Sequence, residues 1–509
     1  MERFLARHSS RILGVVSGFD RLLFRGTLRS ISYVAGMDRF LSSQRILYKD
    51  FAAFAGRITT RVRAHAEAMA QATGRPLEYL RSSSMSKDAR AREILMRDGI
   101  TEGLVCIFSC VESCWTVTVR GDRPSKRLRL VREERRCVFL YFYYVDPAFG
   151  LMHVRLQTWL PLTVQIYVNG REWLARHLTR AGLAVEQQDN ALIPDDDARA
   201  AAISQQLAAF AWAPWLARYA ADVNPWLGGP TGLFRHYYWS VRESEFATDV
   251  IFATPADLQA IYPRLLHHAI EHFTTGDILR FLGRVVPGRF QGEAHSTLVH
   301  RPEGVRIRHW LDENSIKMYD KAGRLLRVEM TLNNSDRFKV LRRRPSDRRL
   351  AWLPLRRGIA DMRRRADLGR AAAARYLDAL SVVGDPIPSH RLLDSVSLRI
   401  IRSGRPYRPL RPISPQDAPL FRTILQGEFT LQGFQNRDLR RQLYPDPVAD
   451  PVQRRHVAAR VTRSLRLLRA HGLIKKVTRT RYYRITIKGH RVMTTALQFR
   501  DTDLALLAA

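Results

Sequence analysis

The stretch Arg136–Val145, RCVFLYFYYV, decides the fold class of this chain. It consists almost entirely of aromatic and aliphatic residues, a composition that favours a strand over a helix. Two segments of similar composition lie beside it, Leu104–Val119 and Leu151–Val168, and turn signals separate the three at Gly121-Asp122 and Asp146-Pro147. We therefore expect an antiparallel meander over these segments.

Helical patterns surround this meander. From Arg3 to about Arg90 the pattern is mostly helical and includes the apolar, glycine-interrupted stretch Ile12–Leu28. A further helix is expected at Arg171–Ala181, before Gly182. Strand and helix patterns then recur between Tyr237 and Thr331. The recurrence suggests a duplicated sheet-plus-helix unit within an α+β body.

The length of 509 residues suggests several domains, at about 150 residues for each. We expect a helical N-terminal region over residues 1–100 and sheet-plus-helix units over 101–195 and 196–340. An arginine-rich helical segment with a Pro/Arg linker should follow over 341–416, and a separate domain over 417–509. The expected fold is thus α+β, with an antiparallel sheet-plus-helix body, a helical N-terminal region and a C-terminal winged helix, for which the evidence is given below.

Charge is the strongest global property of the sequence. There are 83 Lys and Arg residues against 48 Asp and Glu, which gives a formal net charge of +35. Hydrophobic residues make up 46% of the chain, so this charge belongs to a folded protein and not to a basic tail. No run approaches the roughly 18 apolar residues of a membrane span, and the N-terminus has no secretion signal. We expect a cytoplasmic protein that binds nucleic acid, DNA or alternatively RNA, and no membrane.

The C-terminal segment has the pattern of three helices followed by a two-stranded hairpin. Asn436 is expected to cap the second helix. In the third, 456–470, the apolar residues Val457, Val461, Leu465 and Leu468 share one face, which predicts a buried stripe. Basic residues occupy the other faces of this helix and the hairpin after it. The residues singled out as DNA contacts here are Arg460, Arg463, Arg466, Lys475, Lys476 and Arg481.

The phrase Leu467–Ile474, LLRAHGLI, resembles the end of the recognition helix and the first wing strand of bacterial winged-helix regulators. The resemblance covers about residues 417–504. It implies that the third helix enters the major groove and that the hairpin lies against the DNA backbone. A winged helix used only for protein contacts is the alternative. An arginine belt over residues 340–370, with Arg343, Arg344 and Arg364, would add contacts to phosphates.

A hairpin is expected from Asn314–Lys321 and Leu325–Thr331, which are joined by Ala-Gly-Arg. If Lys321 pairs with Leu325, then Tyr319 lies opposite Arg327 and Lys317 opposite Glu329. Period-two alternation then places all four side chains on one face. A tyrosine between cations can ionise more readily, and a nearby carboxylate can hold a divalent metal against a phosphate.

The Tyr-Asp-Lys strand followed by Arg-Val-Glu resembles plasmid rolling-circle replication initiators of the Rep_trans type, which nick one DNA strand through a tyrosine and use acidic metal ligands. The match covers about twenty residues. It implies Tyr319 as nucleophile beside Arg327, and Glu329 as a ligand of Mg²⁺ or Mn²⁺, with Asp249 and Glu245 as further acids. The simpler alternative is that these are exposed hairpin residues forming surface ion pairs.

Four cysteines occur, Cys106, Cys110, Cys114 and Cys137, and they are either zinc ligands or buried free thiols. The gaps of four residues favour free thiols, because compact zinc sites usually use shorter gaps. Two functions therefore remain open for this chain. It is a noncatalytic DNA-binding protein of mobile-element or plasmid type, or a metal-dependent tyrosine nicking initiator or strand transferase.

Overall fold

A computed structural model describes residues 1–81, 85–122, 127–228, 232–283, 294–301, 304–336, 338–344, 346–347, 349–383, 389–426, 429, 433–445, 450–478 and 480–501. The chain divides into two compact units. Unit 1 consists of Met1–Gly14, Val250–Val328 and Ala371–Ala509, and unit 2 of Val15–Asp249 and Glu329–Arg370. Both units are discontinuous in sequence, whereas the domains expected from the sequence were continuous segments.

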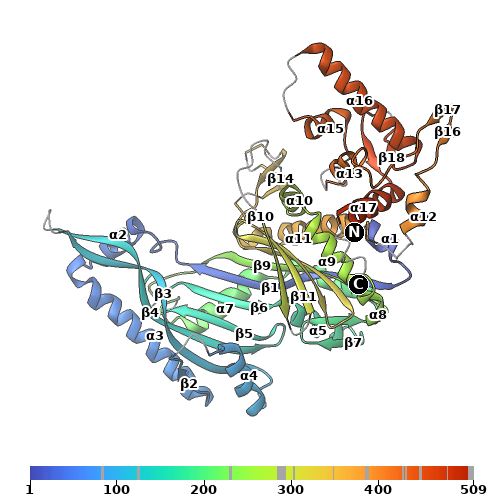
Figure 1. The fold of residues 1–509 in the computed structure, drawn as a ribbon. Coiled ribbons are helices and arrows are strands. Elements are labelled where there is room, and N and C mark those ends of the chain that lie inside the picture. Colours follow the sequence, from blue (N-terminus) through green and yellow to red (C-terminus); the bar gives the residue numbers. More distant parts are fainter. Residues whose placement is uncertain are drawn as a thin grey trace. The chain divides into compact units, whose positions relative to one another are not determined.

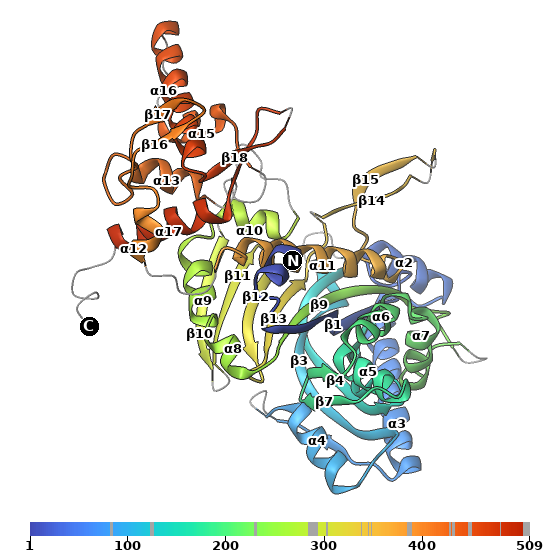
Figure 2. The ribbon, with the colours of Figure 1, turned by 90° about the vertical axis from the view of Figure 1, so that its right-hand side faces the viewer.

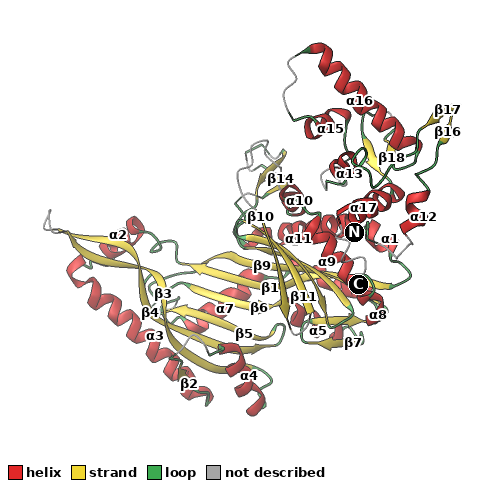
Figure 3. Cartoon of the chain, in the orientation of Figure 1, coloured by secondary structure: helices red, strands yellow, loops and turns green. Residues whose placement is uncertain are grey.

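The described strands include one sheet of eleven, in the order β10-β11-β12-β13-β9-β1-β6-β5-β4-β3-β2. β2 pairs with β3 in parallel, whereas β3–β4, β4–β5, β5–β6 and β1–β6 pair antiparallel, so the sheet is mixed. With the helices around it, this confirms the α+β class (Figure 3). The strands are β1 (Ile12–Thr27), β2 (Leu77–Tyr79), β3 (Gly103–Asp122), β4 (Arg127–Asp146), β5 (Gly150–Gln157), β6 (Val164–Asn169), β9 (Tyr238–Phe252), β10 (Ala294–Arg301), β11 (Gly304–Leu311), β12 (Asn314–Lys321) and β13 (Leu325–Leu332).

The predicted meander is confirmed in unit 2. β3 and β4 pair from Gly103↔Val145 to Asp122↔Arg127, and β5 and β6 continue the antiparallel order. The third expected strand, Leu151–Val168, is two strands instead of one. Pro161 lies between them and has no backbone N–H for a ladder bond, so the chain turns there.

Helices cover both faces of the sheet in unit 2. The hydroxyl of Tyr143 donates to Asp88 on helix α4 (Lys87–Arg97). The hydroxyl of the next residue, Tyr144, donates to Asp222 on helix α7 (Trp212–Val223). Successive strand residues point to opposite faces, so α4 and α7 lie on opposite sides. Figure 2 shows α5 and α6 near α7. The helices of this unit are α2 (Val34–Ser43), α3 (Phe51–Thr73), α4 (Lys87–Arg97), α5 (Gly170–Arg180), α6 (Asp197–Gln206) and α7 (Trp212–Val223), and a small hairpin pairs β7 (Val185–Gln188) with β8 (Ala191–Pro194).

The N-terminal region is mostly helical as expected, apart from the short strand β2 and the segment Ile12–Leu28, where the helical prediction is wrong. This segment contains the long strand β1. Glycines that would weaken a helix are useful in the strand, because they allow close packing. A Cβ at Gly26 would lie 3.0 Å from the ring of Trp239, and one at Gly18 would lie 2.0 Å from the hydroxyl of Ser204.

Unit 1 combines α1 (Glu2–Arg7) with two later segments of the chain. The strand and helix patterns expected between Tyr237 and Thr331 are present, and the strands at their C-terminal end are β11, β12 and β13. The first helix among them begins after Thr254, which forms a capping box with Asp257. The further helices around these strands are α8 (Pro255–Gln259), α9 (Tyr262–Glu271), α10 (Thr275–Phe281) and α11 (Met362–Leu380), which begins in unit 2.

The C-terminal part of unit 1 contains the helices and hairpin expected from the sequence (Figure 1). Val461, Leu465 and Leu468 are buried in its core and Val457 is half-buried. The cap of α15 is Gln435 and not Asn436, whose amide instead donates to Ala458. The elements are α12 (Ser389–Asp394), α13 (Ala418–Ile424), α15 (Asn436–Leu443), α16 (Pro451–Ala470), β18 (Ile474–Lys476), β19 (Tyr483–Ile485) and α17 (Ile487–Asp501).

Two basic segments differ from expectation because each contains a hairpin. The arginine-rich segment, expected to be helical, begins with β14 (Lys339–Arg343) paired with β15 (Leu350–Pro354). The expected extended Pro/Arg linker contains β16 (Ile400–Arg402) paired with β17 (Arg405–Tyr407). Gly404 has φ +70°, a conformation that glycine adopts readily and that permits the tight turn between these strands. Among the described helices, none is both long and apolar enough to cross a membrane.

Candidate functional site

Three carboxylates form a cluster in unit 2. They belong to Asp20 on β1, Glu245 on β9 and Glu329 on β13, three adjacent strands of the sheet. One oxygen from each lies within 4.8 Å of the others, and all three side chains are buried. Buried carboxylates repel one another unless protons or cations balance their charge. Oxygen ligands of this kind suit Mg²⁺ or Mn²⁺.

Polar neighbours orient two members of this acidic cluster. The amide of Asn190 donates to both carboxylate oxygens of Asp20, at 2.9 and 3.1 Å, and the hydroxyl of Thr331 donates to Glu245 at 3.4 Å. Arg21 Nε lies 3.7 Å from Glu245, and its Nη1 lies 3.6 Å from Glu243. Burial lowers the pKa of Arg21, but nearby Glu245, Tyr167 and Glu243 outweigh burial and raise it overall. Hydrogen bonds and ion pairs of this kind fix the orientation of side chains that bind a metal.

The cluster contains two of the three acids suggested by the sequence, Glu245 and Glu329. Asp249 lies outside it: its carboxylate is 3.1 Å from the guanidinium of Arg171, and both side chains are 1% exposed. The third member is Asp20, which was not predicted from the sequence. Asp20 is the one acid in the mostly apolar stretch 18–24, but this stretch was predicted to be helical and not part of the sheet.

A tyrosine shares this region of unit 2. Tyr167 lies opposite His153 in the β5–β6 pair, and their rings stack at 5.2 Å. The guanidinium carbon of Arg21 lies 5.8 Å from the centre of the Tyr167 ring. Burial raises the pKa of Tyr167, while the positive charge of Arg21 acts in the opposite direction. The sequence did not mark this residue, because aromatic residues on strands usually belong to the core.

Cations gather further along β1. Burial lowers the pKa of Arg25, and the positive charges of Arg242, Arg132 and Arg155 lower it further. Trp115 is 53% exposed, with the guanidinium carbon of Arg132 5.2 Å from its ring centre. A cavity of about 270 Å³ is lined by Arg25, Arg132, Trp115 and neighbouring polar residues. We call these four arginines and Trp115 the arginine patch. Charge and an exposed ring together suit a nucleic-acid strand.

Tyr319 lies in unit 1 and is half-buried. It pairs with Arg306 across β11–β12, and Lys317 Nζ is 5.8 Å from its ring centre, so two cations lie near it. Arg327 and Glu329 are fully buried, because β13 is an interior strand between β12 and β9. The alternative of exposed surface ion pairs is therefore wrong for these two residues. The pairing of Tyr319 with Arg327 stays a prediction.

A second basic surface lies in the C-terminal part of unit 1. A groove of about 680 Å³ runs between the end of α16, β18 and the β16–β17 hairpin. Three of the predicted contacts, Arg466, Lys475 and Lys476, line it, and Arg460, Arg463 and Arg481 are exposed. The hairpin that replaced the predicted linker supplies further cations. The six basic residues of this basic groove are Arg402, Arg405, Arg466, Arg469, Lys475 and Lys476, and its lining residues include no acid.

The arginine belt is partly neutralised by neighbouring acids. Arg364 contacts the buried carboxylate of Asp361 at 2.9 Å, and Arg344 lies 4.0 Å from Asp347. Arg343 is exposed on β14. Arg348, another member of the belt, lies outside the described residues. A structural ion pair therefore accounts for Arg364 without any phosphate.

None of the four cysteines forms a disulfide. Cys106 and Cys110 are buried in the core against α4, and burial raises the pKa of each thiol to about 12. Cys114 and Cys137 are half-buried with their sulfurs 2.6 Å apart. Within the described residues, the acidic cluster is the group with metal-ligand spacing, and it contains no cysteine.

No family model, curated protein or solved structure matches this chain. The acidic cluster, the arginine patch and the basic groove are therefore the features of the described residues from which a function can be inferred.

Proposed function

We propose that this protein binds DNA and cleaves or transfers one of its strands by divalent-metal chemistry, in the manner of a plasmid or mobile-element replication initiator. The observation that carries the proposal is the acidic cluster of Asp20, Glu245 and Glu329. Three buried carboxylates on a strongly basic chain are costly to keep together without a cation. A polyanionic substrate supplies the partner that the net charge of +35 favours.

Different residues of unit 2 would bind the metal, orient its ligands and contact the phosphate. Asp20, Glu245 and Glu329 would hold Mg²⁺ or Mn²⁺, and Asn190 and Thr331 fix two of these ligands. A bound divalent ion polarises a phosphoryl oxygen and stabilises the charge that develops there. Arg21 lies beside the cluster and is half exposed, so its guanidinium can contact a phosphate.

A tyrosine hydroxyl is the proposed nucleophile. Its oxygen forms a bond to phosphorus, the bond from phosphorus to the sugar oxygen breaks, and that oxygen takes up a proton while the phenol loses one. Tyr167 belongs to the same unit as the cluster and lies beside Arg21. Tyr319 is the tyrosine implied by the resemblance to Rep_trans initiators. The two are tested separately below.

The arginine patch supports a single-stranded substrate. Arg25 lies four residues beyond Arg21 on β1 and on the same face, a separation of about 13 Å along a strand. Two cations in line along one face of the strand suit the phosphate backbone of an extended nucleic-acid strand. Trp115 offers a ring for stacking a base.

The C-terminal part supports recognition of duplex DNA. Its order of three helices, two strands and a helix agrees with the winged-helix expectation, and the basic groove lies beside α16 and β18. A groove lined by six cations also favours the second candidate function, a DNA-binding protein without catalysis. Catalysis therefore distinguishes the two.

The test is strand cleavage by the full chain. Labelled single-stranded DNA and supercoiled plasmid are incubated with the protein in Mg²⁺, Mn²⁺ or EDTA, and covalent adducts are separated under denaturing conditions. We expect a metal-dependent adduct that Glu245→Gln abolishes. Loss of the adduct in Tyr167→Phe or in Tyr319→Phe identifies the nucleophile, and Tyr79→Phe, at an exposed tyrosine, is the control. Absence of cleavage with every metal and DNA form contradicts the catalytic proposal and leaves the noncatalytic function.

A further inference from the structure

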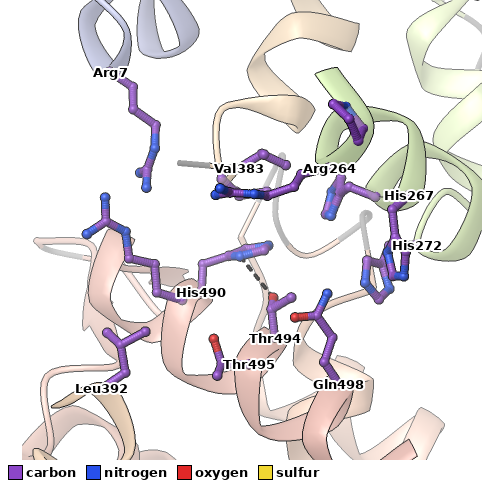
Figure 4. Close-up of a pocket in the computed structure, with 14 residues that line it drawn as sticks. Arg7, Arg264, His267, His272, Val383, Leu392, His490, Thr494, Thr495 and Gln498 are labelled. Atoms are coloured by element: carbon purple, nitrogen blue, oxygen red, sulfur yellow. Dashed lines mark hydrogen bonds between the residues drawn. The ribbon is translucent and has the colours of Figure 1, made fainter. Parts of the chain in front are cut away.

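Unit 1 contains a cavity of about 430 Å³ whose charged lining residues are all basic (Figure 4). It lies among α1, α9, α12, α17 and the segment after α11. Three arginines line it, Arg7 from α1, Arg264 from α9 and Arg491 from α17. Four histidines join them, and none of the fourteen lining residues is Asp or Glu. The histidines are His267, His268, His272 and His490.

The histidines approach one another from two helices. The ring centre of His268 lies 4.9 Å from that of His272 and 5.9 Å from that of His490. His490 also hydrogen-bonds to Thr494 at 3.1 Å through its Nδ1 atom, as drawn in Figure 4. Among the described residues, these rings do not form a group with metal-ligand spacing. A metal ion is therefore not the occupant that this geometry favours.

Burial disfavours the charged form of three of these histidines, His268, His272 and His490. It lowers the pKa of His490 to about 3 and also lowers the pKa values of His268 and His272. A neutral imidazole has one N–H donor and one acceptor nitrogen. The Nε2 atom of His272 is buried and has no hydrogen-bond partner among the described residues.

Part of the lining is apolar. Pro263, Val382, Val383 and Leu392 contribute carbon surface beside the cationic and imidazole groups. A cavity of this volume falls in the range of small-molecule sites, which combine an apolar wall with a few polar groups. Its ligand should therefore carry an anionic group together with an organic part.

We propose that this cavity binds a small phosphorylated molecule. Its phosphate would lie among the three guanidinium groups, which match phosphate oxygens in charge and geometry, with imidazole N–H groups as additional donors. Its organic part would pack against Val382, Val383 and Leu392. The site is separate from the acidic cluster, and the proposal does not depend on strand cleavage.

Binding is measured by calorimetry on the full chain in EDTA, with inorganic phosphate, pyrophosphate and AMP as probes at constant ionic strength. We expect saturable binding, with AMP tighter than inorganic phosphate because of the apolar wall. Arg264→Gln and Arg491→Gln should each weaken binding about tenfold, since each removes a charged hydrogen-bonding group. Arg399→Gln, at an exposed arginine outside the cavity, should leave it unchanged.

Several results would overturn the proposal. These are no saturable binding of any of the three probes, equal binding by the parent protein and both cavity variants, or an equal loss in Arg399→Gln. AMP binding no tighter than inorganic phosphate would overturn the assignment of the apolar wall. Competition by a short DNA duplex at the same affinity as AMP would indicate a DNA-phosphate contact instead of a small-molecule site. Unfolding of the parent and variant proteins is compared by thermal melting, so that a folding defect in one variant leaves the other as the test.

Discussion

Asp249 and Glu245 lie four residues apart on β9, and the structure predicts opposite consequences for removing each charge. Asp249→Asn removes the negative charge from the buried ion pair with Arg171. The positive charge of the Arg171 guanidinium, which is 1% exposed, is then no longer balanced by Asp249. Breaking a buried pair in this way costs about 3–5 kcal/mol. At roughly 2–4 °C for each kcal/mol, the thermal midpoint should fall by about 6–20 °C. Metal affinity should be unchanged, because Asp249 is not in the acidic cluster.

Glu245→Gln removes a ligand and relieves repulsion between like charges. We expect little change in the stability of the metal-free protein and loss of stabilisation by metal. For the parent protein, a metal at 100 times its dissociation constant stabilises by about 2.7 kcal/mol, or roughly 5–11 °C. Melting curves with Mn²⁺ and with EDTA measure both quantities for each variant. Loss of the metal-induced shift in Asp249→Asn would contradict the placement of Asp249 outside the metal site. Retention of that shift in Glu245→Gln would contradict Glu245 as a metal ligand.

Three other predictions concern separate parts of the chain. Burial alone would raise the pKa of Glu112, but hydrogen bonds from Arg155 and Tyr141 outweigh it and lower the pKa from 4.5 to about 2. Its contribution to stability should be present above pH 4.5 and lost as the pH falls toward 2, and acid unfolding of Glu112→Gln should lack this component. Replacing Lys475 by Gln should weaken duplex binding and reduce the slope of log affinity against log salt by about 1, as titrations at several salt concentrations would measure. Gly26→Ala should destabilise unit 2 by about 1–3 kcal/mol in denaturant unfolding, because its Cβ would lie 3.0 Å from the Trp239 ring.

Local patterns in the sequence predicted much of the fold. Arg136–Val145 predicted a strand from its composition. The helix expected at Arg171–Ala181 is α5, which begins at Gly170, and the side chain of Asn169 caps it by accepting two backbone N–H groups. The buried stripe of α16 followed from helical periodicity. β1 was not predicted, because three glycines interrupt its pattern. Its burial follows from neighbours distant in sequence, such as Trp239 and Ser204.

The acidic cluster could be predicted only in part, for a related reason. Its members come from strands far apart in the sequence, and their adjacency depends on the order β13-β9-β1. Glu245 and Asp249 are four residues apart on one strand, so period-two alternation gives them the same face and cannot separate their roles. Their surroundings distinguish the two residues. Asp249 forms an ion pair with the buried Arg171, whereas Glu245 lies near the carboxylates of Asp20 and Glu329.

If unit 2 binds DNA and a divalent metal as proposed, the placement of its charges would link the two binding events. Without a cation, the acidic cluster repels a phosphate and opposes the attraction of Arg21 and the arginine patch. A bound divalent ion reverses the sign of that local field, so a phosphate beside the cluster is bound more tightly when the metal is present. By thermodynamic reciprocity, DNA must then raise the affinity for the metal by the same factor. The basic groove in unit 1 has no acid among its lining residues, so the DNA binding proposed for it would need no metal. Metal dependence of DNA affinity should therefore be confined to the face of unit 2 that carries the cluster.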